Sequence, residues 1–214
     1  QDDAEAVKWY LKAAEQGDAR AQCNIVVKYE QGKGVKQDDA EAITWFRKAA
    51  EQGNSVAQNN LATMYLNGKG IEQDNAEAVK WYLMAAEQDN INAQISLGLM
   101  YRKGEGIPRN YEEAAKWYHK AAERGNAYAR NLLAEMYQEG RGFPQDYAEA
   151  AQLYLKAAEQ ENVNAQVNLG MMYLSGKGVE QDEEEAARWL LKAAHKGIAN
   201  AQNIIGWMYH EGKG

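Results

Sequence analysis

The sequence predicts an all-α protein, an α-solenoid (right-handed superhelix) of antiparallel helix pairs with a 36-residue period. Three observations predict this fold class: aromatic residues recur at that spacing, acidic helix caps recur in the same register, and glycines mark the turns. One position of the repeat holds tryptophan in every unit except one, where Leu153 stands. These tryptophans are Trp9, Trp45, Trp81, Trp117 and Trp189. A second position holds tyrosine throughout, as Tyr29, Tyr65, Tyr101, Tyr137, Tyr173 and Tyr209.

Each repeat contains a longer predicted helix that begins at an Asp or Asn cap. A glutamate follows each cap by three residues, and this spacing indicates a capping box, in which the Glu side chain reaches back to the cap. The caps are Asp2, Asp38, Asp74, Asn110, Asp146 and Asp182. After Asp38, apolar residues recur at helical spacing until Gly53, which ends the helix in a left-handed conformation. Asp89 and Glu161 replace this glycine, at an expected strain of about 1 kcal/mol each.

A shorter helix is predicted over roughly 56–67, and a Gly-x-Gly turn ends it. A single helix pair cannot bury its apolar faces, so the pairs must stack on one another, with the tryptophans and tyrosines filling the wider gaps. The sequence therefore predicts one array over residues 1–214, which we expect to be a segment of a longer array. Its units are 2–37, 38–73, 74–109, 110–145, 146–181 and 182–214.

Composition excludes several classes of function. The chain has 214 residues, with Lys+Arg 24 against Asp+Glu 31, and its net charge is -7. This acidic balance argues against a nucleic-acid binder, and no apolar stretch is long enough to span a membrane. The single cysteine, Cys23, excludes an internal disulfide and is expected to be a small buried or groove residue, with a reactive thiol as the alternative.

Motifs that could indicate catalysis have structural interpretations here. The Gly-Lys-Gly turns lack the preceding strand and following hydroxyl of a phosphate-binding loop. The carboxylates at 112–113 and 183–185 lie in predicted first helical turns, where they favour the helix dipole. His119, His195 and His210 share no helical face that could bind a metal. We expect the recurring tryptophans and tyrosines to pack in the core rather than to form a surface on which bases stack.

The repeated string resembles a known family. Residues 165–179 read Ala-Gln-Val-Asn-Leu-Gly-Met-Met-Tyr-Leu-Ser-Gly-Lys-Gly-Val, and the Asp-x-x-Glu-Ala-x-x-Trp-Tyr-x-Lys-Ala-Ala-Glu-Gln-Gly pattern recurs between such strings. This combination is similar to the Sel1-like repeat, a relative of the tetratricopeptide repeat, and it covers the whole chain. The resemblance implies that the shorter helix of each repeat lines the concave surface.

Positions that vary among the repeats on the shorter helix are candidates for partner binding. They are spaced i, i+4 and i+7, so they share one helix face. The predicted site residues are Asn59, Thr63, Leu66, Ile95, Leu99, Arg102, Asn131, Glu135, Gln138, Val167, Met171, Leu174, Asn203, Trp207 and His210. This mixture of apolar and amide side chains suits a protein or peptide segment. The alternative is solvated variation without a ligand, and for Trp207 a contact with a further repeat.

The sequence therefore predicts a non-catalytic interaction scaffold, without cofactor or metal, that binds a partner protein or peptide along the concave groove. A structural module that self-associates through uncapped ends is a second hypothesis. A third is an enzyme acting on β-lactams, as proposed for cysteine-rich relatives, although this chain lacks their paired cysteines and any evident nucleophile. Composition suits a bacterial protein but does not distinguish cytoplasmic, periplasmic and secreted locations.

Overall fold

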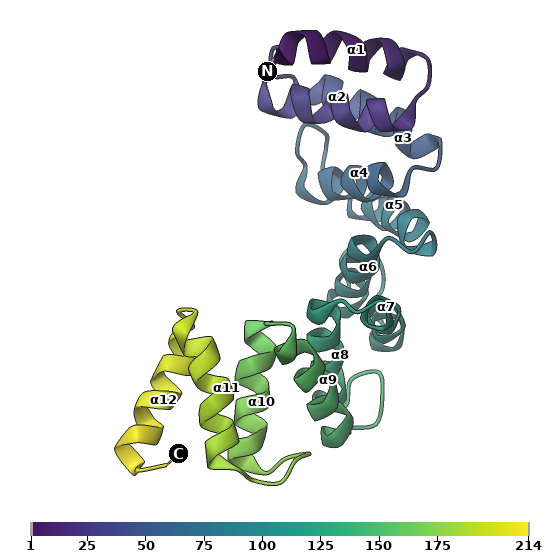
Figure 1. Cartoon of the computed structure of the whole chain (residues 1–214). Coiled ribbons are helices and arrows are strands. Elements are labelled where there is room, and N and C mark those ends of the chain that lie inside the picture. The colour runs from purple at the N-terminus through teal and green to yellow at the C-terminus, as the bar shows by residue number, and fades with distance from the viewer. Residues whose placement is uncertain (1, 214) are drawn as a thin grey trace. The chain divides into compact units, whose positions relative to one another are not determined.

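The computed structural model describes residues 2–213, and its regular structure in this range consists of twelve α-helices (Figure 1). The odd-numbered helices are α1 (Asp3–Glu15), α3 (Asp39–Glu51), α5 (Asn75–Glu87), α7 (Tyr111–Glu123), α9 (Tyr147–Glu159) and α11 (Glu183–His195). The even-numbered helices are α2 (Ala19–Gln31), α4 (Ser55–Asn67), α6 (Ile91–Lys103), α8 (Ala127–Glu139), α10 (Val163–Ser175) and α12 (Ala199–Glu211). Both series advance by the predicted 36 residues, which confirms the all-α repeat fold.

The two helices of each repeat are equally long, so the predicted difference in helix length is wrong. Each described helix has 13 residues, and five of the even-numbered helices begin at a side-chain cap of their own. In α4, the Asn54 side chain accepts a hydrogen bond from the Ala57 N–H at 3.0 Å. The same cap recurs at Asp18, Asn90, Asn126 and Asn162. At α12, Ile198 occupies this position and makes no side-chain cap.

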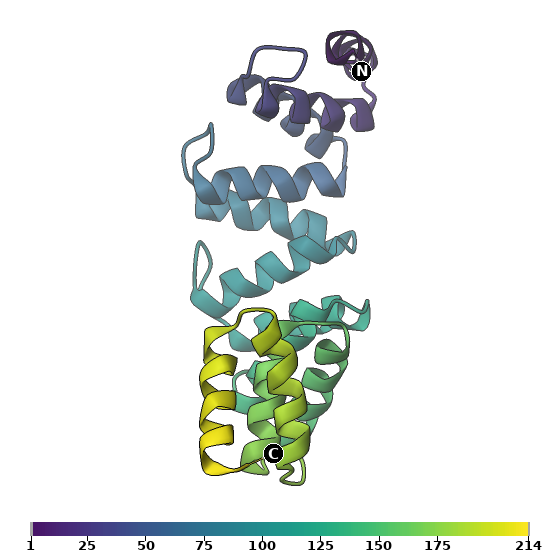
Figure 2. The ribbon, with the colours of Figure 1, turned by 60° about the vertical axis from the view of Figure 1, so that its left-hand side comes forward.

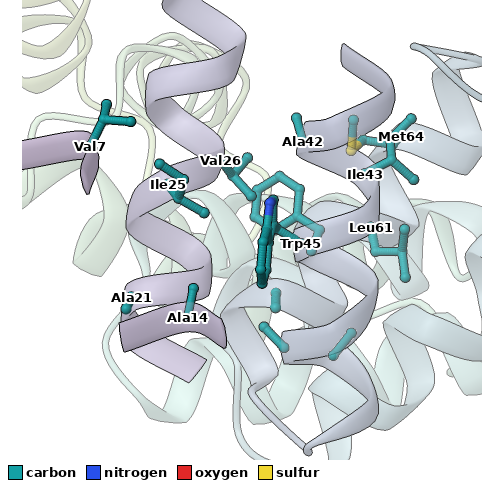
Figure 3. Packing of buried hydrophobic residues seen from close by; sticks show 14 residues of the cluster. Val7, Ala14, Ala21, Ile25, Val26, Ala42, Ile43, Trp45, Leu61 and Met64 are labelled. Atoms are coloured by element: carbon teal, nitrogen blue, oxygen red, sulfur yellow. The ribbon is translucent and has the colours of Figure 1, made fainter. Parts of the chain in front are cut away.

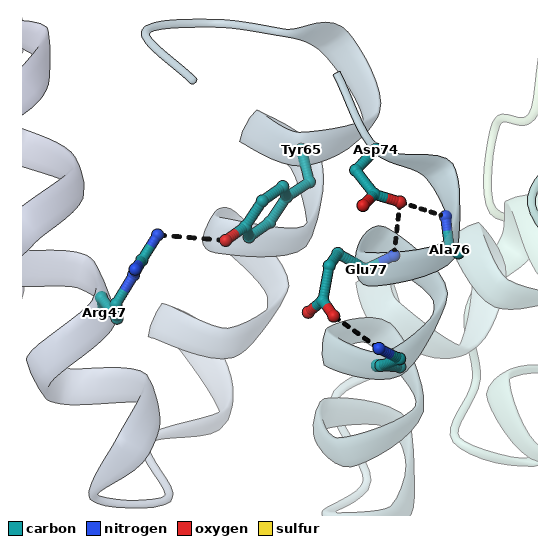
Figure 4. A network of polar contacts seen from close by, with 6 residues as sticks. Arg47, Tyr65, Asp74, Ala76 and Glu77 are labelled. Carbon is teal, nitrogen blue, oxygen red and sulfur yellow. Dashed lines mark hydrogen bonds and ion pairs between the residues drawn. The ribbon is translucent and has the colours of Figure 1, made fainter. Parts of the chain in front are cut away.

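The capping box of the odd-numbered helices is only half as predicted. The Asp74 carboxylate accepts from the N–H groups of Ala76 and Glu77 at 2.9 and 3.0 Å (Figure 4). Glu77, however, pairs with Lys80 instead of reaching back to the cap. The Asp74 N–H donates to the Tyr65 carbonyl at 3.0 Å, so this linker is tied to the end of α4. The Asp38, Asp146 and Asp182 N–H groups donate in the same way to Tyr29, Tyr137 and Tyr173.

The chain divides into two compact units, Gln1–Arg109 and Asn110–Gly214. The first contains α1 to α6 and the second α7 to α12. Within each unit, every helix packs chiefly on the helices that precede and follow it in sequence. Figure 2 shows this succession for α1 to α6, with the linkers between helices at their ends. Each unit can therefore present a face formed by its even-numbered helices and another formed by its odd-numbered helices.

Alanines and large side chains at two adjacent positions of the odd-numbered helices form the core. Trp45 is 6% exposed and lies beside Val26 of α2, in an apolar cluster that also includes Ile25 and Leu61 (Figure 3). Trp117 and Trp189 are buried in the same way, which confirms core packing for these positions, whereas Trp9 on α1 is 61% exposed. The recurring tyrosines are partly buried in five of the six repeats, and Tyr29, Tyr65 and Tyr173 pack against the apolar core, whereas Tyr209 is 68% exposed. The position after the tryptophan is buried as well, with Phe46, Tyr82, Tyr118, Tyr154 and Leu190.

In the Gly-x-Gly turns after α2, α4, α6, α8 and α10, the second glycine lies close to an odd-numbered helix. Gly178 has a φ of +74°, and a Cβ built on it would lie 2.1 Å from the Tyr147 carbonyl oxygen. Only glycine combines this left-handed backbone with such close approach. Asp89 and Glu161 both have a φ of 63°, which confirms the left-handed conformation predicted for them.

Candidate functional site

Two pockets on the even-numbered helices occupy equivalent places in the two units. The α2–α4 pocket has a volume of about 240 Å³ and is lined by Glu30, Phe46, Asn60, Thr63, Met64, Asn67 and Lys69. The α8–α10 pocket has a volume of about 280 Å³ and is lined by Gln138, Tyr147, Asn168, Met171, Met172, Ser175 and Lys177. Six positions of each lining correspond at a spacing of 108 residues, which is three repeats. The repeat geometry itself therefore forms this pocket.

An ion pair closes one side of the α2–α4 pocket. The Lys69 ammonium lies 2.7 Å from a Glu30 carboxylate oxygen, and this hydrogen bond raises the pKa of Lys69. The Thr63 hydroxyl forms a 2.8 Å hydrogen bond with the hydroxyl of Tyr82, which is buried behind it on α5. The lining thus presents amides and a hydroxyl over the apolar side chains of Phe46 and Met64.

A polar network lies beside the α8–α10 pocket. The buried Asn131 amide donates to the Glu135 carboxylate at 2.8 Å and accepts from Asn168 at 3.4 Å. Tyr154 lies behind them, and burial, followed by the negative charges of Glu135 and Glu139, raises the pKa of its hydroxyl. These groups fix the Asn168 side chain, one of the pocket's hydrogen-bonding residues. Met171, by contrast, is 44% exposed at the pocket.

The structure separates the predicted site residues into three groups. Ile95, Asn131 and Val167 are buried, because this position on the even-numbered helices lies in the packing between helices. Partly buried residues are Asn59, Thr63, Leu66, Leu99, Arg102, Glu135, Gln138 and Leu174. Exposed residues are Met171, Asn203, Trp207 and His210, and Lys213 lies 5.1 Å from the centre of the Trp207 ring. Thr63, Gln138 and Met171 line the two pockets.

Several pocket residues were missed by the sequence analysis. Asn60 and Asn168 come directly after positions on the predicted face, and they belong to a position that also varies among repeats. Lys69 and Lys177 lie in the Gly-x-Gly turns, which we interpreted only as helix ends. Their variation, from lysine to Glu105 and Arg141, was the signal that could have identified them.

Larger cavities between the odd-numbered helices are better explained as gaps in the packing of successive repeats than as binding sites. The α1–α3 cavity has a volume of about 440 Å³ and includes Gln22, Trp45, Lys48 and Gln52 in its lining. The Gln52 amide donates to Gln22 at 2.9 Å, and Gln22 donates to the Ala14 carbonyl at 3.1 Å. Lys48 covers the Trp45 ring at 4.1 Å. These contacts between lining side chains hold successive repeats together.

Other candidate chemistry finds little support in the geometry. Burial raises the pKa of the Cys23 thiol, which is opposite to the shift of a reactive cysteine. Across residues 2–213, no three His, Cys, Asp or Glu side chains converge to hold a metal ion. None of the helices described is both long and apolar enough to cross a membrane.

Comparison with protein families gives one result for the whole chain. A family described as Sel1 repeat matches residues 1–18, 20–54, 55–90, 91–126, 127–162, 163–198 and 199–214. In this phase, each complete repeat consists of an even-numbered helix followed by an odd-numbered one. No curated protein sequence matches the chain.

Solved structures share both fold and sequence with the chain. It is 40% identical, with a TM-score of 0.92, to c5321, a protective antigen of uropathogenic Escherichia coli strains with an SLR fold. That match covers 96% of this chain but 44% of c5321. A Sel1 repeat protein from Oxalobacter formigenes is 33% identical, with a TM-score of 0.84 and coverage of 98% and 88%. Cysteine rich protein B from Helicobacter pylori is 26% identical, with a TM-score of 0.50 and coverage of 62% and 95%.

Proposed function

Because this chain belongs to the Sel1 repeat family, whose members generally serve as non-catalytic interaction scaffolds, we propose that it binds an extended segment of a partner protein along its even-numbered helices. The recurrence of one pocket at the same repeat positions in both units carries this proposal. An extended segment presents its side chains singly, so a small pocket that recurs at the same repeat positions suits it better than a compact ligand.

The pocket chemistry matches that of a peptide. Main-chain amides need hydrogen-bond partners when they leave water, and Asn60, Asn67 and Asn168 provide both donors and acceptors. Side chains need apolar contacts, and Met171 and Trp207 expose large apolar surfaces at the same position of successive even-numbered helices. A methionine surface adapts to differently shaped side chains, which suits a binding face of broad specificity.

A pair of methionine substitutions tests the assignment of the binding face. Met171 on α10 and Met84 on α5 are 44% and 47% exposed, so Asp at either position changes charge and apolar surface similarly. Peptides selected from a displayed random library on the wild-type protein serve as probes. We expect Met171→Asp to weaken their binding at least tenfold, by loss of an apolar anchor, and Met84→Asp to change it less than twofold. Circular dichroism of both variants controls for folding.

The opposite pattern contradicts the proposal. If Met84→Asp weakens binding while Met171→Asp does not, the odd-numbered helices form the binding face. If the library yields no peptide that binds, or neither substitution affects binding, the even-numbered helices are not a peptide-binding surface.

A further inference from the structure

The two equivalent pockets differ in charge. In the α2–α4 pocket, Glu30 neutralises Lys69 across a distance of 2.7 Å. Gln138 occupies the position of Glu30 in the α8–α10 pocket, so the equivalent Lys177 has no carboxylate opposite it. Among the described residues, the Lys177 ammonium has no ion-pair partner, and it lies 5.5 Å from the centre of the Tyr147 ring. The α8–α10 lining therefore carries one uncompensated positive charge, whereas the α2–α4 lining is neutral.

Nearby acidic groups on α8 have other partners. Glu135 accepts a hydrogen bond from Asn131 at 2.8 Å, and the Glu139 carboxylate lies 3.0 Å from the Arg141 guanidinium. Neither carboxylate belongs to the pocket lining. The unpaired lysine also contrasts with the net charge of -7 for the whole chain, which otherwise repels acidic ligands.

We propose that the α8–α10 pocket selects an Asp or Glu side chain of a segment bound to its unit, while the α2–α4 pocket accepts an uncharged residue. This inference rests on the proposed peptide-binding function. Lys177 would supply the charge, and the Asn168 amide and the Ser175 hydroxyl line the same pocket as additional donors. Met171 and Met172 would contact the aliphatic part of the acidic side chain. Partial enclosure strengthens a charged hydrogen bond relative to one in open water.

Matched peptides measure the selectivity. The probes are library-selected peptides that contain an acidic residue, each paired with a synthetic version carrying the corresponding amide. Fluorescence anisotropy at about 0.1 M salt gives both affinities. We expect the wild-type protein to bind the acidic version about fivefold more tightly, which is the upper range for a partly exposed ion pair.

Substitutions that convert the charged pocket lining into the neutral one, or the reverse, identify which residues cause the preference for the acidic peptide. Gln138→Glu reproduces the neutral arrangement of Glu30 and Lys69, so the preference for the acidic peptide should fall below twofold. Lys177→Gln should have the same effect by removing the charge. Glu30→Gln releases Lys69, and we expect a second acidic preference in peptides selected on this variant. Lys80→Gln, which removes a lysine from α5, is the matched control and should leave the preference unchanged.

The outcomes separate this inference from the proposed function. If acidic and amide peptides bind equally but Met171→Asp abolishes binding, the face binds peptides and the acidic selectivity is wrong. If Gln138→Glu and Lys177→Gln leave the acidic preference intact, another group causes it and the inference fails. If no peptide binds, or Met171→Asp has no effect on binding, both proposals are overturned.

Discussion

Single glycines determine how closely the turns approach the helices. Gly178 and Gly53 both have positive φ angles, but their surroundings differ. A Cβ at Gly178 would meet the Tyr147 backbone, whereas nothing lies within 4 Å of one at Gly53. Glycine is thus favoured at Gly53 for backbone conformation alone, whereas at Gly178 it is also required for packing.

Alanine substitutions should distinguish these two causes. Gly53→Ala should lower the free energy of unfolding by about 1 kcal/mol, the cost of a left-handed alanine. Gly178→Ala should lower it by about 2–4 kcal/mol, because overpacking against backbone adds to that cost. Urea titration followed by circular dichroism provides both values. Equal losses for the two variants would show that the contact with Tyr147 costs nothing.

Residue-scale prediction from sequence succeeded where the cause is local. The left-handed conformations of Asp89 and Glu161 follow from their alignment with glycine positions, and the structure confirms them. The contact between Gly178 and Tyr147 could not be predicted in this way, because it joins residues 31 positions apart through tertiary packing.

Glycines within helices control the spacing of neighbouring helices. Gly170 lies in α10, and a Cβ there would approach the Leu190 side chain on α11 to 2.7 Å. Gly206 holds the equivalent position in α12, where nothing lies within 4 Å. The same residue type is therefore required for packing in one helix and merely unfavourable for helix formation in the other.

The two helical glycines should respond to alanine with opposite signs. Gly206→Ala should raise the free energy of unfolding by up to about 1 kcal/mol through higher helix propensity. Gly170→Ala should lower it by about 1–3 kcal/mol, because α10 and α11 must move apart. Thermal melts of both variants can test this. An increase in stability for Gly170→Ala would mean that Leu190 adjusts without cost.

At the scale of elements, the periodic pattern predicted the helices but not all their hydrogen bonds. Asn54 was missed as a cap because it follows Gly53, and such pairs also indicate simple turns. The return bond of the capping box was predicted wrongly because the Tyr65 carbonyl competes for the Asp74 N–H. In the candidate site, a single-helix pattern identified Thr63 and Met171 but missed Lys177, which follows the end of α10.

For the whole molecule, packing between successive helices implies that stability is local. Leu190 is fully buried on α11 and belongs to the apolar cluster that includes Val167 and Ile205. In repeat proteins, each repeat interacts mainly with its neighbours, so a defect need not destabilise distant repeats equally.

Hydrogen exchange should show this local response. Leu190→Ala creates a core cavity at a cost of about 2–5 kcal/mol, so amides in α10 to α12 should exchange faster. Amides in α2 to α4 should keep their wild-type rates. Leu61→Ala, in the first unit, should give the reverse pattern by mass spectrometry. A uniform increase along the chain in either variant would indicate that the units unfold as one cooperative block.

The recurrence of helix boundaries at 36 residues also has a consequence for how such genes can change. An in-frame gain or loss of 108 nucleotides would leave the junctions between consecutive helices in register. Recombination between repeats could therefore change the number of such pockets without redesigning the core. Point changes such as glutamate to glutamine beside a turn lysine would then alter the charge of one pocket while its neighbours keep theirs.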